Sequence, residues 1–333
     1  MPSSIVSTFD DPDAYQTAIR DVQAETVVTG RGAFCAYLAA IRLDRLALQR
    51  GKETLSRVAY SALDPGRFGV VFTTSAGPPA YISGLELSPG EVIVHGARSE
   101  GHNRSSGACQ WGSIALTHET IAAAGQALIG CELVAPPSTH RIKPPQQLLS
   151  ELLNLHEAVE HLARSAPEML ANTEIVRALD QSLMRVLILC LSEGQALEAG
   201  SAHWRHAAAL RRLEDFLGAN SDRTLYAAEL CAVAAVSDRT LRTLCQEHLG
   251  MSPTRYLWLR RMHLAHRALR MADPATSTVT EIATNYGFWE LGRFSVGYRS
   301  LFGESPSAAL RRPPDDPGPQ KIIGSPWHLP ESA

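Results

Sequence analysis

Apolar residues in the last third of the chain recur at helical spacing in two similar blocks. The first block runs from Thr224 to Gly250 and the second from Thr278 to Gly303. In each block the spacing predicts a short helix, a tight turn and a longer helix. Each block ends in Gly-x-Ser-Pro, at 250–253 and 303–306, and an amphipathic helix is predicted between the blocks over Pro253–Met271.

Residues that favour helix ends stand where these helices are predicted to begin and end. Thr278 and Glu281 form a Thr-x-x-Glu capping box, and Gly287 suits the left-handed end of the same helix. In the first block Ser237 suits the start of the longer helix, because its hydroxyl can accept a backbone N–H. Leu241, four residues later, is predicted to face inward.

The outer face of that longer helix carries Arg239, Arg242 and Thr243. A helix fits the major groove of DNA, and an arginine there can bind O6 and N7 of one guanine. The linking helix, about 20 residues at ~1.5 Å each, spans ~30 Å, which is close to the ~34 Å of one duplex turn. The blocks are therefore predicted to be two helix-turn-helix units that enter successive major grooves. The alternative is a plain helical bundle with solvated arginines, and the repetition favours DNA binding.

The chain resembles the AraC/XylS family of bacterial transcription regulators in two runs: SDRTLRTLCQEHLGMSPTRYLWLRRMHLA, from Ser237, and GFWELGRFSVGYRSLFGESPSAALR, from Gly287. The resemblance covers about the last third of the chain. It implies transcriptional regulation, including activation, through binding to promoter DNA. It also implies DNA contacts from a set of positions on the two longer helices: Ser237, Arg239, Thr240, Arg242, Thr243, Gly292, Arg293, Val296 and Arg299.

The chain departs from the family pattern in the turns and in the second unit. Ala235 stands in the first turn where glycine is common, and Glu290 is a weaker helix start than the family usually has. Gly297 lies inside the second longer helix, where glycine costs about 1 kcal/mol relative to alanine. Among positions 292, 293 and 296 only Arg293 is charged. We therefore expect the first unit to read most of the sequence and the second to grip the DNA backbone.

Charge is unevenly distributed along the chain. Residues 201–312 contain 15 arginines, no lysine and 10 acidic residues, a formal charge of +5, whereas the remainder of the chain carries −8. A basic terminal domain beside an acidic domain is typical of a protein that binds DNA through one of its domains. Because +5 is a modest charge, tight binding is expected to need a dimer or two subsites.

Short apolar or alternating runs, separated by Gly, Pro and Ser turns, predict strands from Gly32 to Leu133. The clearest is Leu85–Ala97, a strand, a Pro-Gly turn and a buried strand, which is similar to cupin-like β-barrels. Such barrels often form the effector-sensing half of this regulator family. Ala97–Gly112 is predicted to be a polar loop that either lines a ligand mouth or simply joins two strands.

Two amphipathic helices are predicted after this region, over Gln146–Ser165 and Ile175–Gly194. The family resemblance implies that they pair two protomers, and the alternative is that they pack on their own barrel. The predicted fold class is α+β: a β-rich cupin-like domain with two following helices, then an all-α domain of two helix-turn-helix units joined by a long helix. The predicted boundaries are 1–145, 146–195, a linker at 196–204, the DNA-binding domain at 205–312 and a Pro-rich disordered tail at 313–333.

The cupin likeness raises an enzyme or metal-binding alternative, with a DNA-binding domain attached. Metal-binding cupins use a His-x-His pair, which is missing here. The histidines are interpreted instead as loop and surface residues (His95, His102, His118, His140) or as members of solvated helix faces (His203 with His206, His263 with His266). No catalytic, cofactor or metal-binding residue is predicted. A regulator that senses no small molecule is a third alternative.

The sequence also bears on compartment and partners. Six cysteines lie scattered without a Cys-x-x-Cys pair, which favours a reducing compartment. We find no secretory signal at the N-terminus and no apolar run of about 18 residues. The expected setting is the bacterial cytoplasm, and the expected partners are double-stranded promoter DNA, a second copy of the chain, a small-molecule effector and RNA polymerase, with no membrane.

Overall fold

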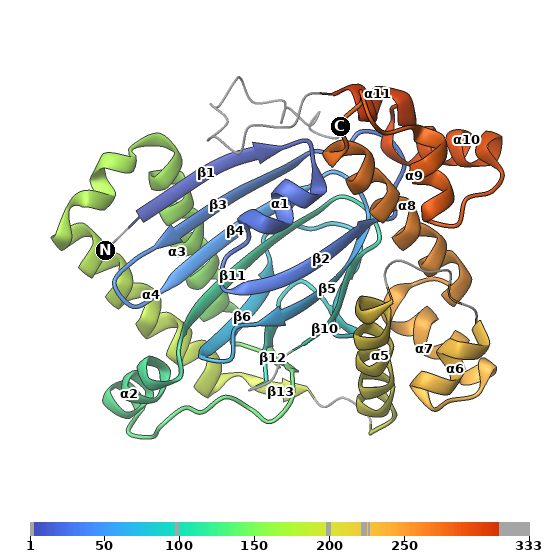
Figure 1. Ribbon diagram of the computed structural model, residues 1–333. Coiled ribbons are helices and arrows are strands. Elements are labelled where there is room, and N and C mark those ends of the chain that lie inside the picture. Colours follow the sequence, from blue (N-terminus) through green and yellow to red (C-terminus); the bar gives the residue numbers. More distant parts are fainter. Residues whose placement is uncertain (1–2, 97–99, 198–200, 221–224, 226, 313–333) are drawn as a thin grey trace, which may run out of the picture.

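The structure is a computed structural model that describes residues 3–312 apart from 97–99, 198–200, 221–224 and 226. Figure 1 shows two β-sheets in the N-terminal part and helices alone from about residue 201 onward. The predicted α+β class is therefore confirmed. The predicted Pro-rich tail lies outside the described residues.

The larger sheet runs in the order β1 (Ser3–Phe9), β3 (Ala36–Arg42), β4 (Ala47–Glu53), β11 (Cys109–Thr117), β6 (Arg67–Thr73), β9 (Val92–Val94), β12 (His140–Lys143) and β13 (Gln195–Leu197). The smaller sheet runs in the order β2 (Val22–Val28), β5 (Arg57–Leu63), β10 (Glu100–Ser105), β7 (Ala80–Ile82) and β8 (Leu85–Leu87). The pairs are antiparallel, as expected for strands joined by short turns.

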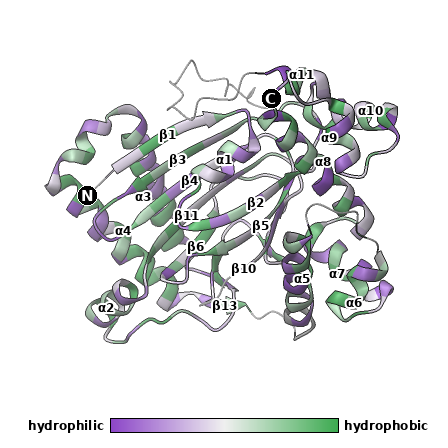
Figure 2. Ribbon diagram, viewed as in Figure 1, coloured by the Kyte–Doolittle hydropathy of each residue, from purple (hydrophilic) through white to green (hydrophobic). Residues whose placement is uncertain are grey.

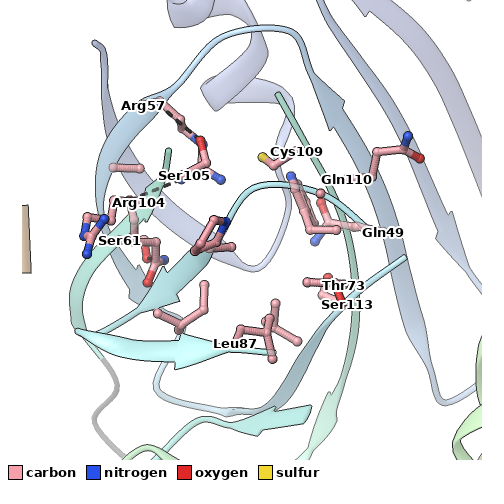
Figure 3. A pocket seen from close by; sticks show the side chains of 18 of the residues that line it. Gln49, Arg57, Ser61, Thr73, Leu87, Arg104, Ser105, Cys109, Gln110 and Ser113 are labelled. Carbon is pink, nitrogen blue, oxygen red and sulfur yellow. Dashed lines mark hydrogen bonds between the residues drawn. The ribbon is translucent and has the colours of Figure 1, made fainter. Parts of the chain in front are cut away.

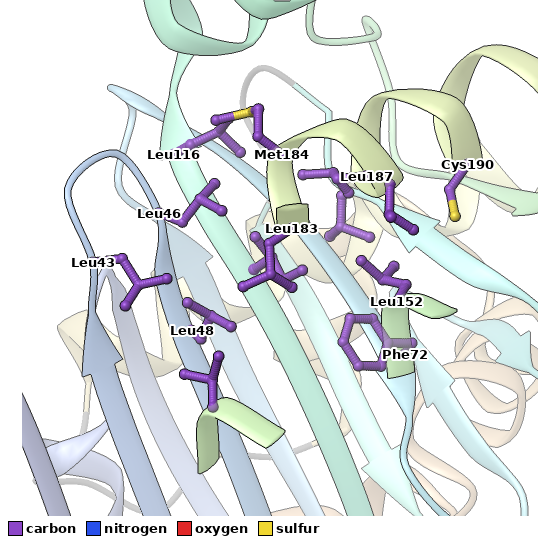
Figure 4. Packing of buried hydrophobic residues seen from close by; sticks show 14 of the residues in the cluster. Leu43, Leu46, Leu48, Phe72, Leu116, Leu152, Leu183, Met184, Leu187 and Cys190 are labelled. Atoms are coloured by element: carbon purple, nitrogen blue, oxygen red, sulfur yellow. The ribbon is translucent and has the colours of Figure 1, made fainter. Parts of the chain in front are cut away.

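Helices cover the outer face of the larger sheet. They are α2 (His118–Ile129), α3 (Gln146–Ser165) and α4 (Thr173–Glu193), with a short 3-10 turn at Pro167–Ala171. Helix α1 (Pro12–Ala18) lies on the inner face, where Tyr15 packs with Ala36 and Leu38 of β3. Figure 4 shows Leu46, directly before β4, and Leu48 of β4 facing Leu152 of α3 and Leu183 of α4, and all four are buried. Fully burying a leucine stabilises a fold by about 1.5–3 kcal/mol. The two predicted helices thus pack on their own sheet, and their pairing between protomers stays a prediction.

The second core lies in the helical part and is built around a central helix. Its elements are α5 (Ser201–Ala219), α6 (Ala227–Ala234), α7 (Asp238–Leu249), α8 (Pro253–Met271), α9 (Val279–Asn285), α10 (Leu291–Phe302) and α11 (Pro306–Arg311). Leu259 and Met262 of α8 are buried in it, together with Val27 and Val58 from the smaller sheet. Figure 2 shows hydrophobic residues on the inner sides of these helices and strands. The apolar contact therefore continues across the boundary between the two parts.

Two predictions about N-terminal segments need correction. The segment 97–112, predicted as a polar loop, contains β10 and the start of β11, joined by a short turn. Asn103 and Ser105 of β10 are polar because they line a cavity, and for this reason the sequence pattern did not predict a strand here. The predicted linker at 196–204 contains the end of β13 and the start of α5, because β13 pairs with β12. Within the described ranges, none of the helices is long and apolar enough to cross a bilayer.

Candidate DNA-binding interface and its contacts with the β-sheets

The first unit consists of α6, a tight turn and α7. Ser237 begins α7 as predicted: its Oγ accepts the N–H of Thr240 at 3.2 Å. The turn before it places Ala235 at φ 54°, the left-handed conformation that Gly287 adopts at φ 76° in the second unit. The two turns thus share a left-handed residue, although only the second uses glycine.

The predicted reading face of α7 is open to solvent. Arg239, Arg242 and Thr243 are exposed, whereas Leu241 and Leu244 are buried beneath them. Arg242 Nε lies 2.9 Å from Asp238 Oδ2, but both side chains are largely exposed. An exposed ion pair of this kind contributes about 0–1 kcal/mol. A DNA base or phosphate can therefore replace Asp238 as the partner of Arg242.

The second unit consists of α9, a turn and α10. Thr278 Oγ1 accepts the N–H of Glu281 at 3.1 Å, which is half of the predicted capping box. At the start of α10, Glu290 makes no capping hydrogen bond among the described residues and instead pairs with Arg293 at 3.0 Å. The predicted sites on α10 are all exposed: Gly292, Arg293, Val296 and Arg299.

Two features of α10 were not anticipated from the sequence. Trp289, two residues before α10, is 77% exposed and Val296 of α10 is 73% exposed, so two apolar side chains lie on the surface that also carries Arg293 and Arg299. The signal for Trp289 was available, since it falls outside the buried spacing of Phe294 and Tyr298. Gly297 has a packing reason: a Cβ there would lie 3.1 Å from the Trp258 ring of α8.

Partly buried polar contacts join the helical part to α1 and the smaller sheet. Arg267 of α8 binds Asp13 with two nitrogens, at 2.6 and 3.0 Å. Arg260 Nη2 lies 3.3 Å from Glu25, and its other terminal nitrogen donates to the Leu217 carbonyl at 3.0 Å. These contacts fix α8, the helix that joins the two units.

Histidines interpreted as solvated are buried at this contact. His263 donates from Nε2 to the Val28 carbonyl at 2.9 Å, and His266 stacks on Phe302 with 4.2 Å between ring centres. Burial lowers the pKa of His263 to about 4 and that of His266 to about 3. The solvated interpretation was wrong for this pair, because the sheet and α10 cover it. His206 lies partly exposed beside Glu247, and the side chain of His203 lies outside the described residues.

A buried carboxylate joins β10 to α5 and α8. His102, interpreted from the sequence as a loop or surface residue, is 1% exposed and donates from Nε2 to Glu214 at 2.8 Å. Tyr256 donates its hydroxyl to the same oxygen at 3.0 Å. Burial alone would raise the pKa of Glu214, but His102, Arg260 and Tyr256 outweigh it and hold the pKa below its usual value.

Comparison with known proteins supports the DNA-binding assignment. The family described as a helix-turn-helix domain matches residues 230–312. The probable thc operon regulatory protein of Rhodococcus erythropolis is 35% identical over 163 residues, 49% of each chain. XylDLEGF operon transcriptional activator 1 of Pseudomonas putida is 38% identical over 101 residues, 30% of each chain.

One solved structure is also similar to part of this chain. A probable AraC family transcriptional regulator from Rhodopseudomonas palustris is 36% identical, and the match covers 94% of that chain and 31% of this one, with a TM-score of 0.29. The helix-turn-helix part of the chain is thus similar to that of AraC/XylS-type regulators. The chain spans half or less of the length of the two curated relatives above.

The N-terminal part of the chain contains a cavity of about 230 Å³ between its two sheets (Figure 3). Tyr15, Arg57, Cys109 and Trp111 line it and converge on the buried Glu53. The distances to the carboxylate are 2.8 Å from Tyr15 Oη, 2.6 Å from Arg57 Nε, 3.4 Å from Cys109 Sγ and 3.0 Å from Trp111 Nε1. Although burial opposes ionisation, Arg57 and the other donors lower the pKa of Glu53. At the polar end of the cavity the negative charge of Glu53 is therefore neutralised by Arg57.

The lining of the cavity can be compared with the alternative that this part of the chain is a metal-binding cupin. His95 lines it, and burial lowers the pKa of this imidazole to about 4. The described residues offer a three-ligand group only at His206, Glu247 and His248, on α5 and α7. That group lies in the helical part, so the cavity itself lacks the ligand set of a metal-binding cupin among the residues described.

Proposed function

We propose that this chain is a sequence-specific regulator of transcription that inserts α7 and α10 into successive major grooves of promoter DNA. The observation that carries the proposal is the exposed face of Arg239, Arg242 and Thr243 on α7, above a fully buried inner face. Bidentate arginine–guanine contacts can supply sequence reading from this face. Ser237 and Thr240 take part through the cap that orients the helix start.

The second unit contributes through a different chemistry. Arg293 and Arg299 supply charge for phosphate or base contacts, whereas Trp289 and Val296 present apolar groups. In the major groove the apolar recognition feature of a base pair is the thymine methyl group. We therefore assign α10 a preference for thymine at its contact positions, in addition to the backbone grip expected from the sequence.

Control is assigned to the cavity between the sheets. Its position between the two sheets and its mixture of apolar and polar lining residues suit a small-molecule effector. Strand β10 connects this cavity to the helical part, since Asn103 and Ser105 line the cavity while His102 binds Glu214 on α5. An effector that displaces β10 would thus bias the position of the DNA-binding units.

The proposal includes partners and a setting. The curated relatives named above are an operon regulatory protein and an operon activator, which favours activation and hence contact with RNA polymerase. A homodimer is included because the helical part, at +5, carries a modest charge for tight binding on its own. The bacterial cytoplasm is the setting in which these partners occur.

The experiment is footprinting of genomic DNA by the full chain, followed by titration of one recovered site at several salt concentrations. We expect a protected site that spans two major-groove turns and an affinity that falls steeply with salt. Sequence-independent binding would contradict the assignment. Quenching of Trp111 fluorescence by metabolites, with Trp111→Phe as the control, tests the cavity separately from DNA binding.

A further inference from the structure

A second cavity, of about 320 Å³, lies between the smaller sheet and the helical part. Arg104 and Ser105 of β10 form one side, and Gly250 and Arg255 form the other. Its volume lies within the range of about 300–1,000 Å³ that small-molecule sites occupy. It shares Arg104 and Ser105 with the cavity between the sheets, but Arg255 lines only this second cavity.

The charge of this second cavity is positive on both sides. Arg104 and Arg255 line it, and none of its lining residues is acidic. In the described part of the chain no ion pair joins either arginine to a carboxylate, and Arg104 Nε is buried without a hydrogen-bond partner. Burial, and next the nearby charge of Arg31, lower the pKa of Arg255. The charged residues that line this cavity are thus both cationic.

Aromatic rings and glycine hold the two guanidinium groups in place. Arg104 lies 3.5 Å above the ring of Tyr81, and Arg255 lies 4.4 Å from the ring of Trp258. Gly250, at φ 72°, ends α7 directly beside Arg104, and a Cβ there would lie 3.3 Å from Arg104 Nη1. Stacking orients a planar guanidinium without neutralising it, so its N–H groups stay available for an anion.

The remaining lining supplies both polar and apolar partners. Thr29, Ser56 and Ser106 carry hydroxyls that can donate to anion oxygens. Val58 and Leu259 form an apolar wall that fits a short carbon chain. We propose that this cavity binds a small amphipathic oxyanion, a carboxylate or a phosphate ester, which bridges Arg104 of the sheet and Arg255 of α8.

The site has a mechanical consequence. Arg104 belongs to β10, which also lines the effector cavity, and Gly250 ends the first recognition helix α7. An anion held by both arginines would tie the sheet to the start of α8, which directly follows the end of α7. Binding of the anion should therefore raise the melting temperature of the free protein.

The test uses the full chain without DNA, so its failure is separate from failure of the DNA-binding proposal. Calorimetric titration at constant ionic strength compares pentanoate, pentyl phosphate and the uncharged pentanamide. We expect at least one anion to bind about tenfold or more tightly than pentanamide, because charge-assisted bidentate hydrogen bonds need the oxyanion. Which anion binds more tightly distinguishes a carboxylate ligand from a phosphate ester.

Variants locate the site. Arg104→Gln and Arg255→Gln should each lower the anion affinity about tenfold, and circular dichroism should show that both remain folded. Arg211→Gln is the matched control, because Arg211 also spans the domain contact, 3.6 Å from Glu100, but does not line this cavity. Equal binding of pentanoate, pentyl phosphate and pentanamide, or no binding of either anion at about 10 mM, would overturn the proposal. An unchanged affinity in Arg255→Gln would do so too, because it would place the anion in the cavity between the sheets.

Discussion

Replacing Ala235 by glycine should stabilise the helical part of the chain. Ala235 sits in the turn between α6 and α7 at φ 54°, and the corresponding residue of the second unit, Gly287, sits at φ 76°. The second unit therefore shows glycine in the same backbone conformation at the corresponding position. A left-handed alanine is strained because its Cβ approaches the following carbonyl oxygen, whereas glycine has no Cβ.

The magnitude follows from two opposing contributions. Removing the Cβ from a left-handed residue releases about 1–2 kcal/mol of strain. Glycine also makes the unfolded chain more flexible, which offsets about 0.4–1 kcal/mol of that gain. Ala235 is exposed, so its methyl adds little burial energy. The net expectation for Ala235→Gly is about 0.5–1 kcal/mol of added stability, and Gly287→Ala should lose a similar amount.

Urea unfolding followed by circular dichroism at the helix band measures both variants. The midpoint should rise for Ala235→Gly and fall for Gly287→Ala, with the slope against urea unchanged. Gly218→Ala is the matched control, since Gly218 lies in α5 with open space around its Cβ position and without a positive φ. Ala there should stabilise by about 0.5–1 kcal/mol through helix propensity. If Ala235→Gly left the midpoint unchanged or lowered it, the strain argument would be refuted.

Further predictions concern DNA reading and the domain contact. Arg239→Ala and Arg242→Ala should each lose about 1–3 kcal/mol of discrimination against mismatched sites with the fold intact, and equal selectivity in competition assays would rule out the proposed reading face. Replacing thymine by uracil in the site should weaken the wild type but not the Trp289→Ala, Val296→Ala double variant, because only the methyl group is removed; equal weakening of both proteins would exclude an apolar contact from α10. Glu214→Gln should destabilise the chain at pH 7. Because the folded pKa of Glu214 lies below its usual 4.5, its stabilisation is present above that pH and is lost as the pH falls through the folded pKa. The difference in urea midpoint between the two proteins should therefore shrink at low pH, and a difference independent of pH would contradict the role of the ionised carboxylate.

Residues close together in the sequence were sufficient to predict the helices of the two helix-turn-helix units. Ser237 and Thr278 cap their helices through backbone N–H groups a few residues away, so the short-range pattern contained the cause of each helix start. The spacing of apolar residues in α8 likewise predicted which of its side chains are buried in the second core. The reason for Gly297 was not local, since the Trp258 ring that excludes a Cβ there comes from another helix.

The domain contact was missed because its causes are distant in sequence. His263 and Val28 lie 235 residues apart, and His102 and Glu214 lie 112 residues apart. A histidine on a helix has no local mark that separates a solvated ring from one that donates to a remote carbonyl. Strand β10 was hidden for a related reason. Its polar residues face a cavity, so the usual alternation of apolar and polar positions was absent.

The contacts at the two glycine exits explain how the sheets can influence DNA reading without covering the reading face. Gly250 ends α7 beside Arg104, and Gly303 ends α10 with its Cβ position 3.2 Å from the backbone nitrogen of Ala33. Each recognition helix is thus held at its far end by the N-terminal part, while its outer face stays exposed. Under the proposed function, a ligand that shifts β10 would move the end of α7 without uncovering its reading face, which is already exposed. Since coupling between two ligands is reciprocal, DNA must then change the effector affinity by the same factor as the effector changes the DNA affinity.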